Sequence, residues 1–456
     1  MELRPHPLYI WYDARKWIWL LLIPVLRALF SPRDALSILF ASFRDVGIAL
    51  LLIGYSFLKW QGARYRLHSG VTLEQGLLFH RALRVVEEGA ASVEVERTPL
   101  MWLTRASRVR VNTAGLRRRA DATLYLHARQ ARSLVGSGSV HRAGALYAAR
   151  VWPVTVLAAS GSNAAVGLLT LAPALRQAGE LLGSQVPDQV YSLVDRVLSL
   201  GLPPLFRSLA NLLVLSWGAA FLGSWLRYVG FAARREGDNL HLTSGLLTRR
   251  NTFIDSHKIT ALELRQTLFM RVFRLYTATI TAAGYGREKG ARPVVVPAAR
   301  AKELSAALDR LMPDYPICSS CLRPQAAQIL RFAGLPLAMM AAGFLPLWLG
   351  GVWRAAAAVW FVGTGWWLLI RLAGFRWSGF GVGSGAVTIR YSRGLALYAV
   401  HVPLEVADCV ILRRSPFQRR SGTCTVELRC FGEKRRRHRA LALPYDQALA
   451  LVERIR

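Results

Sequence analysis

Residues 76–115 read GLLFHRALRVVEEGAASVEVERTPLMWLTRASRVRVNTAG, and residues 245–284 read GLLTRRNTFIDSHKITALELRQTLFMRVFRLYTATITAAG. The two stretches align over 40 residues without a gap, 169 positions apart, and share ten identical residues. In the first stretch these are Gly76, Leu77, Leu78, Arg81, Glu94, Thr98, Met101, Arg105, Ala114 and Gly115. A repeat of this length indicates a fold built from copies of one unit, so the unit must be understood first.

A third and more divergent copy covers residues 394–432, GLALYAVHVPLEVADCVILRRSPFQRRSGTCTVELRCFG. A slip of one residue after Gly394 places Ser415 on Thr98 of the first copy. A generic β-hairpin pattern is the alternative explanation for this stretch. We expect a true third copy.

Each copy combines short strand-like runs with a closing helix. In the second copy, runs rich in β-forming residues occupy 239–242, 251–254, 261–264, 277–281 and 293–296. A helix is expected at about 298–311, because Ala301, Leu304 and Leu308 fall on one face. The third copy ends similarly, at about 445–455. This order predicts an α+β unit, a small antiparallel β-sandwich or barrel capped by a C-terminal helix.

Composition and charge suggest a membrane protein with basic domains. The mean hydropathy is +0.27 and 53% of the residues are hydrophobic, which is unusually apolar for a soluble protein. The formal net charge is +32, and most of it lies in the repeat regions 61–150, 227–328 and 371–456. The apolar residues must therefore lie mainly between the copies.

Two apolar stretches precede each copy. They cover 17–30 and 45–60, then 151–172 and 208–226, then 329–349 and 355–371. A membrane crossing needs about 20 apolar residues in a helix, so we expect three transmembrane pairs and a polytopic α-helical membrane protein. The first pair is short and contains Arg27, and an interfacial or re-entrant hairpin is its alternative. Excess Arg on one side predicts that the copies face the cytoplasm of a multi-pass inner-membrane protein.

The runs YSFLKW, YRL, LEQGLL, VEVERTPL and ASRVRVNTAG resemble the second type of bacterial pleckstrin-homology-like (PH-like) domain. The opening Arg4-Pro5-His6-Pro7-Leu8 and the layout of three units and six helices resemble the YdbT-like membrane proteins. The resemblance implies a sandwich capped by a helix and does not imply an enzyme. It also implies a shorter single-domain membrane partner, and it is compatible with a homo-oligomer.

The resemblance gives the expected domain order. We expect a cytoplasmic N-terminus (1–16), transmembrane pair 1 (17–60), PH-like domain 1 (61–147), transmembrane pair 2 with an extracytoplasmic connection (148–229), PH-like domain 2 (230–315), transmembrane pair 3 (329–372) and PH-like domain 3 (375–456).

The sequence contains none of the common catalytic signatures, such as GxxxxGK[ST], HExxH or GxSxG. Cys318 and Cys321 form a CxxC that lacks a second pair at zinc spacing, and Cys409, Cys424 and Cys430 lie at apolar strand positions typical of packing residues. We therefore predict a non-enzymatic protein without a cofactor or a metal site.

Clustered basic residues are the remaining candidates for a site. Anionic headgroups attract basic residues near a membrane, so contact with such lipids or an acidic partner is one hypothesis, and a solvated Arg-rich face is the alternative. The candidates are Arg117, Arg118, Arg119, Arg249, Arg250, Lys258, Arg413, Arg414, Arg419, Arg420, Arg435, Arg436 and Arg437. Because the basic runs lack interleaved aromatic residues, nucleic acid is not an expected partner.

The sequence thus favours an inner-membrane scaffold that presents PH-like domains to the cytoplasm for protein assembly or lipid contact, in envelope maintenance or stress. A six-helix transporter or lipid-handling protein is the alternative. None of the later four apolar stretches has an Asp, Glu or Lys at its centre, and Asn211 is their only strongly polar side chain; transport usually requires ionisable residues there, so this favours the scaffold.

Overall fold

The fold is taken from a computed structural model of the chain. The structure describes residues 2–15, 35–67, 71–75, 81–85, 90–113, 122–135, 146–161, 204–282, 293–315, 321–344, 353–383, 385–394, 396–430 and 436–455. The chain forms two compact units, each described by itself. Unit 1 comprises Met1–Ser139 and Leu247–Asp255, and unit 2 comprises Val140–Leu246 and Ser256–Arg456.

The three copies contain the same elements in the same order: six strands followed by a closing helix. The first copy has β2 (Arg64–Leu67), β3 (Val71–Gln75), β4 (Arg81–Val85), β5 (Ala90–Arg97), β6 (Ala106–Thr113), β7 (Ala122–His127) and α5 (Ala128–Val135). The second has β9 (Ala232–Glu236), β10 (Asn239–Ser244), β11 (Arg249–Asp255), β12 (Ile259–Thr267), β13 (Leu275–Ala282), β14 (Val294–Arg300) and α11 (Ala301–Leu311). The third has β15 (Gly379–Gly383), β16 (Ala386–Arg393), β17 (Ala396–Pro403), β18 (Ala407–Arg413), β19 (Thr423–Cys430), β20 (Arg436–Pro444) and α16 (Tyr445–Glu453). The third copy and both closing helices are confirmed.

A short helix connects the fourth and fifth strands of every copy: α4 (Pro99–Leu103), α10 (Leu268–Val272) and α15 (Pro416–Arg420). Each begins after a capping hydroxyl that accepts the backbone N–H three residues later, at 3.2–3.4 Å. The capping residues are Thr98, Thr267 and Ser415. Such caps satisfy one of the free N–H groups at a helix start, which explains why these positions align between the copies.

A left-handed residue follows each short helix. Arg105 and Arg274 have φ angles of 53° and 54°, and Gly422 has 59° at the equivalent place in the third copy. This conformation reverses the chain into the fifth strand. It favours glycine, because a side chain there crowds the backbone.

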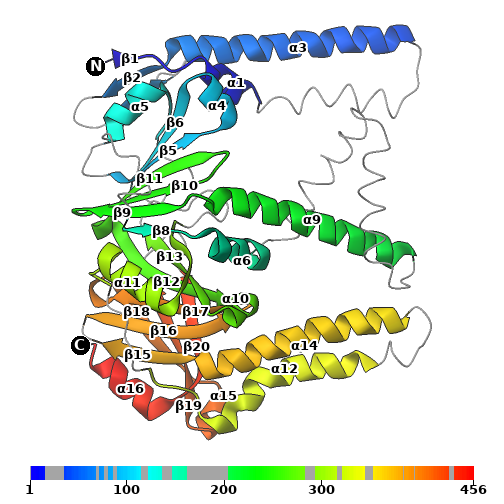
Figure 1. The fold of residues 1–456 in the computed structure, drawn as a ribbon, viewed down its shortest axis with the longest axis vertical. Coiled ribbons are helices and arrows are strands. Elements are labelled where there is room, and N and C mark those ends of the chain that lie inside the picture. Colours follow the sequence, from blue (N-terminus) through cyan, green and yellow to red (C-terminus); the bar gives the residue numbers. More distant parts are fainter. Residues whose placement is uncertain are drawn as a thin grey trace. The chain divides into compact units, whose positions relative to one another are not determined.

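A pair of helices precedes each copy: α1 (Leu8–Ala14) and α3 (Ala35–Gly62), α6 (Val151–Gly161) and α9 (Pro204–Tyr228), and α12 (Ile329–Ala342) and α14 (Trp353–Trp377). In unit 2, α12 and α14 lie side by side, and α6 lies beside the C-terminal half of α9 (Figure 1). In each pair a tryptophan of the second helix hydrogen-bonds to the backbone of the first. Trp217 Nε1 donates to Ala159 O at 3.2 Å, and Trp360 Nε1 donates to Met339 O at 2.7 Å. The smaller elements are β1 (Glu2–Leu3), β8 (Tyr147–Ala148), η4 (Ser256–Lys258), η5 (Ala326–Gln328) and η6 (Leu404–Val406).

The predicted fold class needs a correction. None of the helices in the described part of the chain combines the length and hydropathy that a membrane crossing requires. In α3, for example, Arg44, Asp45 and Lys59 leave only 13 uncharged residues between them, well short of about 20. The predicted α+β units are present, but the polytopic helical part of the prediction, with its multi-pass arrangement, is wrong. Stretch 17–30 and the second half of 151–172 lie outside the described residues.

The copies are joined by strand pairing between neighbouring copies. In unit 1 the sheet runs β7-β6-β5-β11, so the third strand of the second copy pairs with the fourth strand of the first. In unit 2 the sheet runs β14-β13-β12-β17-β16-β15, so the third copy pairs with the second in the same way. We call β5–β11 the first joint and β12–β17 the second joint. Both are antiparallel.

The inner faces of the strands form the cores of the copies. In the third copy, the buried cluster includes Phe380, Val400, Val426 and Ala448, which lies on the closing helix. Cys424 and Cys430 belong to this cluster, as predicted, whereas Cys409 is exposed on β18 and its predicted packing role is wrong. The alternation of strand residues explains the difference, because Cys409 lies on the face opposite Val410.

Candidate functional site

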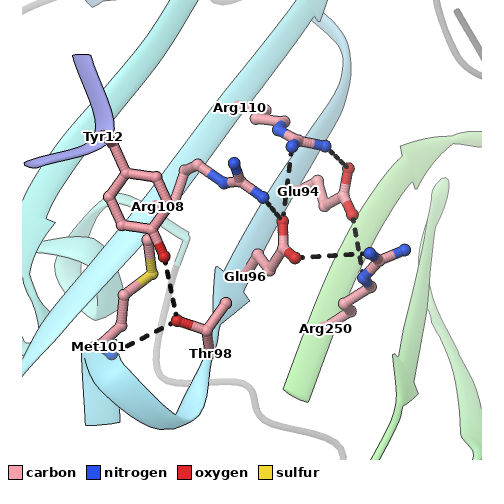
Figure 2. A network of polar contacts seen from close by, with 8 residues as sticks. All are labelled: Tyr12, Glu94, Glu96, Thr98, Met101, Arg108, Arg110 and Arg250. Atoms are coloured by element: carbon pink, nitrogen blue, oxygen red, sulfur yellow. Dashed lines mark hydrogen bonds and ion pairs between the residues drawn. The ribbon is translucent and has the colours of Figure 1, made fainter. Parts of the chain in front are cut away.

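The outer face of the first joint carries an ion-pair network (Figure 2). Glu94 and Glu96 on β5 face Arg110 on β6, whose two terminal nitrogens each lie 3.6 Å from one of these carboxylates. Arg108 on β6 hydrogen-bonds to Glu96. From the second copy, Arg250 Nη2 reaches Glu96 Oε1 at 3.4 Å, and its Nε lies 4.0 Å from Glu94. Arg250 therefore links two copies through charge as well as through the strand ladder.

Burial and charge act differently on the two carboxyl groups. Burial raises the pKa of Glu94, and Arg110 and Arg250 only partly oppose it. Burial acts in the same direction on Glu96, but the Arg108 and Arg250 charges and the Arg108 hydrogen bond outweigh it and lower the pKa. Three guanidinium groups thus neutralise two buried acids. Figure 2 also shows Tyr12 beside this network, with its hydroxyl 3.2 Å from the capping oxygen of Thr98.

The corresponding face of the third copy has a different charge balance. Glu427 on β19 is covered by four arginines, Arg413, Arg429, Arg437 and Arg439, whose Nε atoms lie 2.9–3.8 Å from its oxygens. Their side chains remain 22–55% exposed, so positive charge is in excess and reaches solvent. Cover by these side chains opposes ionisation of Glu427, but hydrogen bonds from Arg429 and Arg439 lower its pKa. We call these five residues the Glu427 cluster.

The short helices expose large apolar side chains. On α10 and its C-cap, the exposed fractions are 40% for Phe269, 76% for Val272 and 37% for Phe273. The equivalent α4 exposes Leu100, Trp102 and Leu103 by 43–80%, and α15 exposes Phe417 by 76%. We call each short helix with these side chains a tip. Exposed arginines flank the tips: Arg105, Arg271, Arg274, Arg419 and Arg420.

The structure places the predicted basic residues in different surroundings. Arg249, Arg419 and Arg420 are exposed, and Lys258 is half-buried at the end of η4. Arg250 lies in the first-joint network, and Arg413 and Arg437 lie in the Glu427 cluster. Arg414 stacks 4.0 Å from the centre of the Tyr445 ring. Arg436 belongs to β20, while Arg117, Arg118, Arg119 and Arg435 lie outside the described residues, as does Cys318.

The sequence analysis did not predict the buried glutamates of the ion-pair clusters or the exposed apolar side chains of the tips. Glu94, Glu96 and Glu427 were not recognised, although an acid at alternate strand positions within a basic copy is a usable signal. The apolar residues of the tips immediately follow the capping residues and could have been found from that spacing. No group of side chains suited to a metal ion occurs in the described ranges.

A model of the family described as "Bacterial PH domain" matches residues 192–312 and 330–456, more than half of the chain. The chain belongs to the bacterial PH domain family. The transmembrane protein YdbT of Bacillus subtilis (strain 168) is 24% identical over 123 residues, which are 26% of this chain and 25% of that relative. The chain therefore matches about a quarter of this relative's length. No solved structure matches the chain. The matched ranges include the second and third bacterial PH domains, and the resemblance seen in the sequence is confirmed.

Proposed function

We propose that this protein is a non-enzymatic scaffold of bacterial PH domains, associated with the cytoplasmic face of a bacterial inner membrane through anionic lipid. Its similarity to YdbT, a transmembrane protein, supports a membrane location. The joints support a scaffold, because strand pairing keeps neighbouring domains attached in a defined register. A role in envelope maintenance or stress belongs to the same proposal.

The observation that carries this proposal is the α10 tip. Val272 is 76% exposed and projects no polar group, while its neighbours Arg271 and Arg274 are exposed and charged. Apolar side chains flanked by basic residues suit the boundary between headgroups and acyl chains. Burying one such side chain contributes about 1.5–3 kcal/mol, and each nearby Arg contributes about 1 kcal/mol at an anionic surface.

The test measures binding of the full chain to vesicles of phosphatidylcholine with or without phosphatidylglycerol. The test variant replaces Trp102, Val272 and Phe417 with Asp, one residue in each tip. All three side chains are at least 73% exposed, so folding should be preserved. We expect at least a tenfold loss of binding to the anionic vesicles, because apolar contacts are lost and negative charges are added.

Matched controls separate insertion from a general charge effect. Val272→Asp is compared with Ser305→Asp, which adds the same charge on α11 at an exposed site outside the tips. Only Val272→Asp should weaken binding. Unchanged binding of the triple variant, or equal losses for Val272→Asp and Ser305→Asp, would contradict the proposed membrane contact.

A further inference from the structure

The third copy presents a strand edge that is covered in the other two copies. We propose that β18 pairs with an extended segment of another protein, and that this segment carries an acidic residue opposite Arg413. The inference goes beyond the proposed membrane contact, because it concerns a protein partner and a different face of the third copy.

The fourth strands of the three copies are equivalent in detail. Each has a register irregularity against its fifth strand, between Ala90 and Ser92, between Ile259 and Ala261, and between Ala407 and Cys409. Each leads into a short helix through the same hydroxyl cap. The equivalence means that β18 offers the same backbone edge as β5 and β12.

Both joints use the same register on that edge. In the first joint Phe253 lies opposite Val93, and in the second His401 lies opposite Leu262. Val93 and Leu262 occupy equivalent places, each five residues before the capping threonine. A strand bound to β18 in this register would place one residue opposite Val410 and another opposite Arg413.

Among the described strands, β18 is the outer member of the sheet β18-β19-β20. Asp408, Cys409 and Arg413 on this strand are exposed. A strand edge offers N–H and C=O groups to a further strand, and proteins commonly bind extended segments in this way. The two joints show that this family edge accepts a strand within the present chain.

Charge identifies the kind of segment. In the first joint Arg250 lies opposite Glu96 and pairs with it. The equivalent of Glu96 in the third copy is Arg413, which lies in the positively charged Glu427 cluster. The complementary residue is therefore Asp or Glu. A second copy of the chain could offer β4, the equivalent third strand, but it would bring Arg81 opposite Arg413, and the chain carries a net charge of +32.

Disulfide trapping on the full chain tests the register and the charge together. Cys409 is a free, exposed cysteine at the place equivalent to Ser92, which lies opposite Ile254 in the first joint. The probe is a peptide of residues 249–255 with Arg250→Glu and Ile254→Cys, incubated in a glutathione buffer. The comparison peptide keeps Arg250. We expect about tenfold more trapping of the acidic peptide at Cys409, located by mass spectrometry.

Three controls make the result decisive. Cys409→Ser should abolish trapping, a peptide with the cysteine moved from 254 to 253 should be trapped poorly, and Arg413→Glu should reverse the preference between the two peptides. Equal trapping of acidic and basic peptides would overturn the proposal. So would efficient linkage of Cys409 to a Val85→Cys variant of a second chain, because Val85 is the β4 residue expected opposite it and the occupant would then be another copy. Vesicle binding is measured separately, so either proposal can fail alone.

Discussion

Replacing Arg250 with methionine tests whether ion pairs stabilise the first joint. Methionine keeps an unbranched apolar stem, so the change mainly removes the guanidinium group. Glu96 loses a contact of 3.4 Å and Glu94 loses one of 4.0 Å, and both carboxyl groups are at most 10% exposed. A hydrogen bond to a charged group contributes about 1.5–3 kcal/mol. Because Arg108 and Arg110 remain and Arg250 is 29% exposed, we expect the joint to lose about 1–2 kcal/mol.

Hydrogen exchange of the β5 and β11 amides measures the free energy of opening this joint. A loss of about 1–2 kcal/mol corresponds to exchange that is about 5–30 times faster. Arg249→Met is the matched control, because Arg249 is exposed on the same strand and lies opposite Arg97 rather than an acid. It should change the opening free energy by less than about 0.5 kcal/mol. Equal acceleration in both variants, or none with Arg250→Met, would refute the role of the network.

Three further predictions concern stability. At the second joint, burial lowers the pKa of His401 to about 4, and the ring hydrogen-bonds to Thr388. The unfolded chain therefore takes up this proton at higher pH than the folded chain, so stability present above pH 6.5 is lost as the pH falls toward 4. Urea unfolding should show about 2 kcal/mol more loss between pH 7.5 and 5 in the wild type than in His401→Gln, and identical losses would disprove this effect. Thr267→Ala removes the cap of α10 and should cost about 1 kcal/mol in the same assay, whereas Thr267→Ser should retain most of the stability. Arg274→Gly should add up to about 1 kcal/mol to the free energy of unfolding, and so raise the thermal midpoint, because glycine removes the steric cost of the left-handed backbone. A lower midpoint would show that contacts of the Arg274 side chain contribute more than this cost.

The repeated sequence could predict local structure because local chemistry determines it. The alignment pairs Thr98 with Thr267 and Arg105 with Arg274, and these pairs are respectively the helix caps and the left-handed residues. Met101 recurs as Met270 in the second copy for a similar reason, since both side chains are fully buried beneath their short helices. Such positions depend on neighbours a few residues away.

The joints could not be predicted in this way. Arg250 is one of the identical positions of the repeat, yet the repeat itself does not indicate the ion-pair network that Arg250 forms with the preceding copy. Its partners, Glu94 and Glu96, lie more than 150 residues earlier, and their proximity depends on which strands pair. Hydropathy failed differently: within the described residues it located apolar helices, but it overestimated their ability to cross a membrane.

Strand pairing between copies also delays the completion of each sheet during biosynthesis. β11 emerges from the ribosome about 160 residues after β5, which is on the order of 10–30 s at about 5–20 residues per second. During this interval the edge of β5 lacks its final partner, and a similar wait separates β12 from β17. Uncovered strand edges recruit other chains, so nascent proteins on neighbouring ribosomes are the most immediate competitors. The speed of translation between residues 97 and 249 should therefore influence how much of the newly made protein reaches its native pairing.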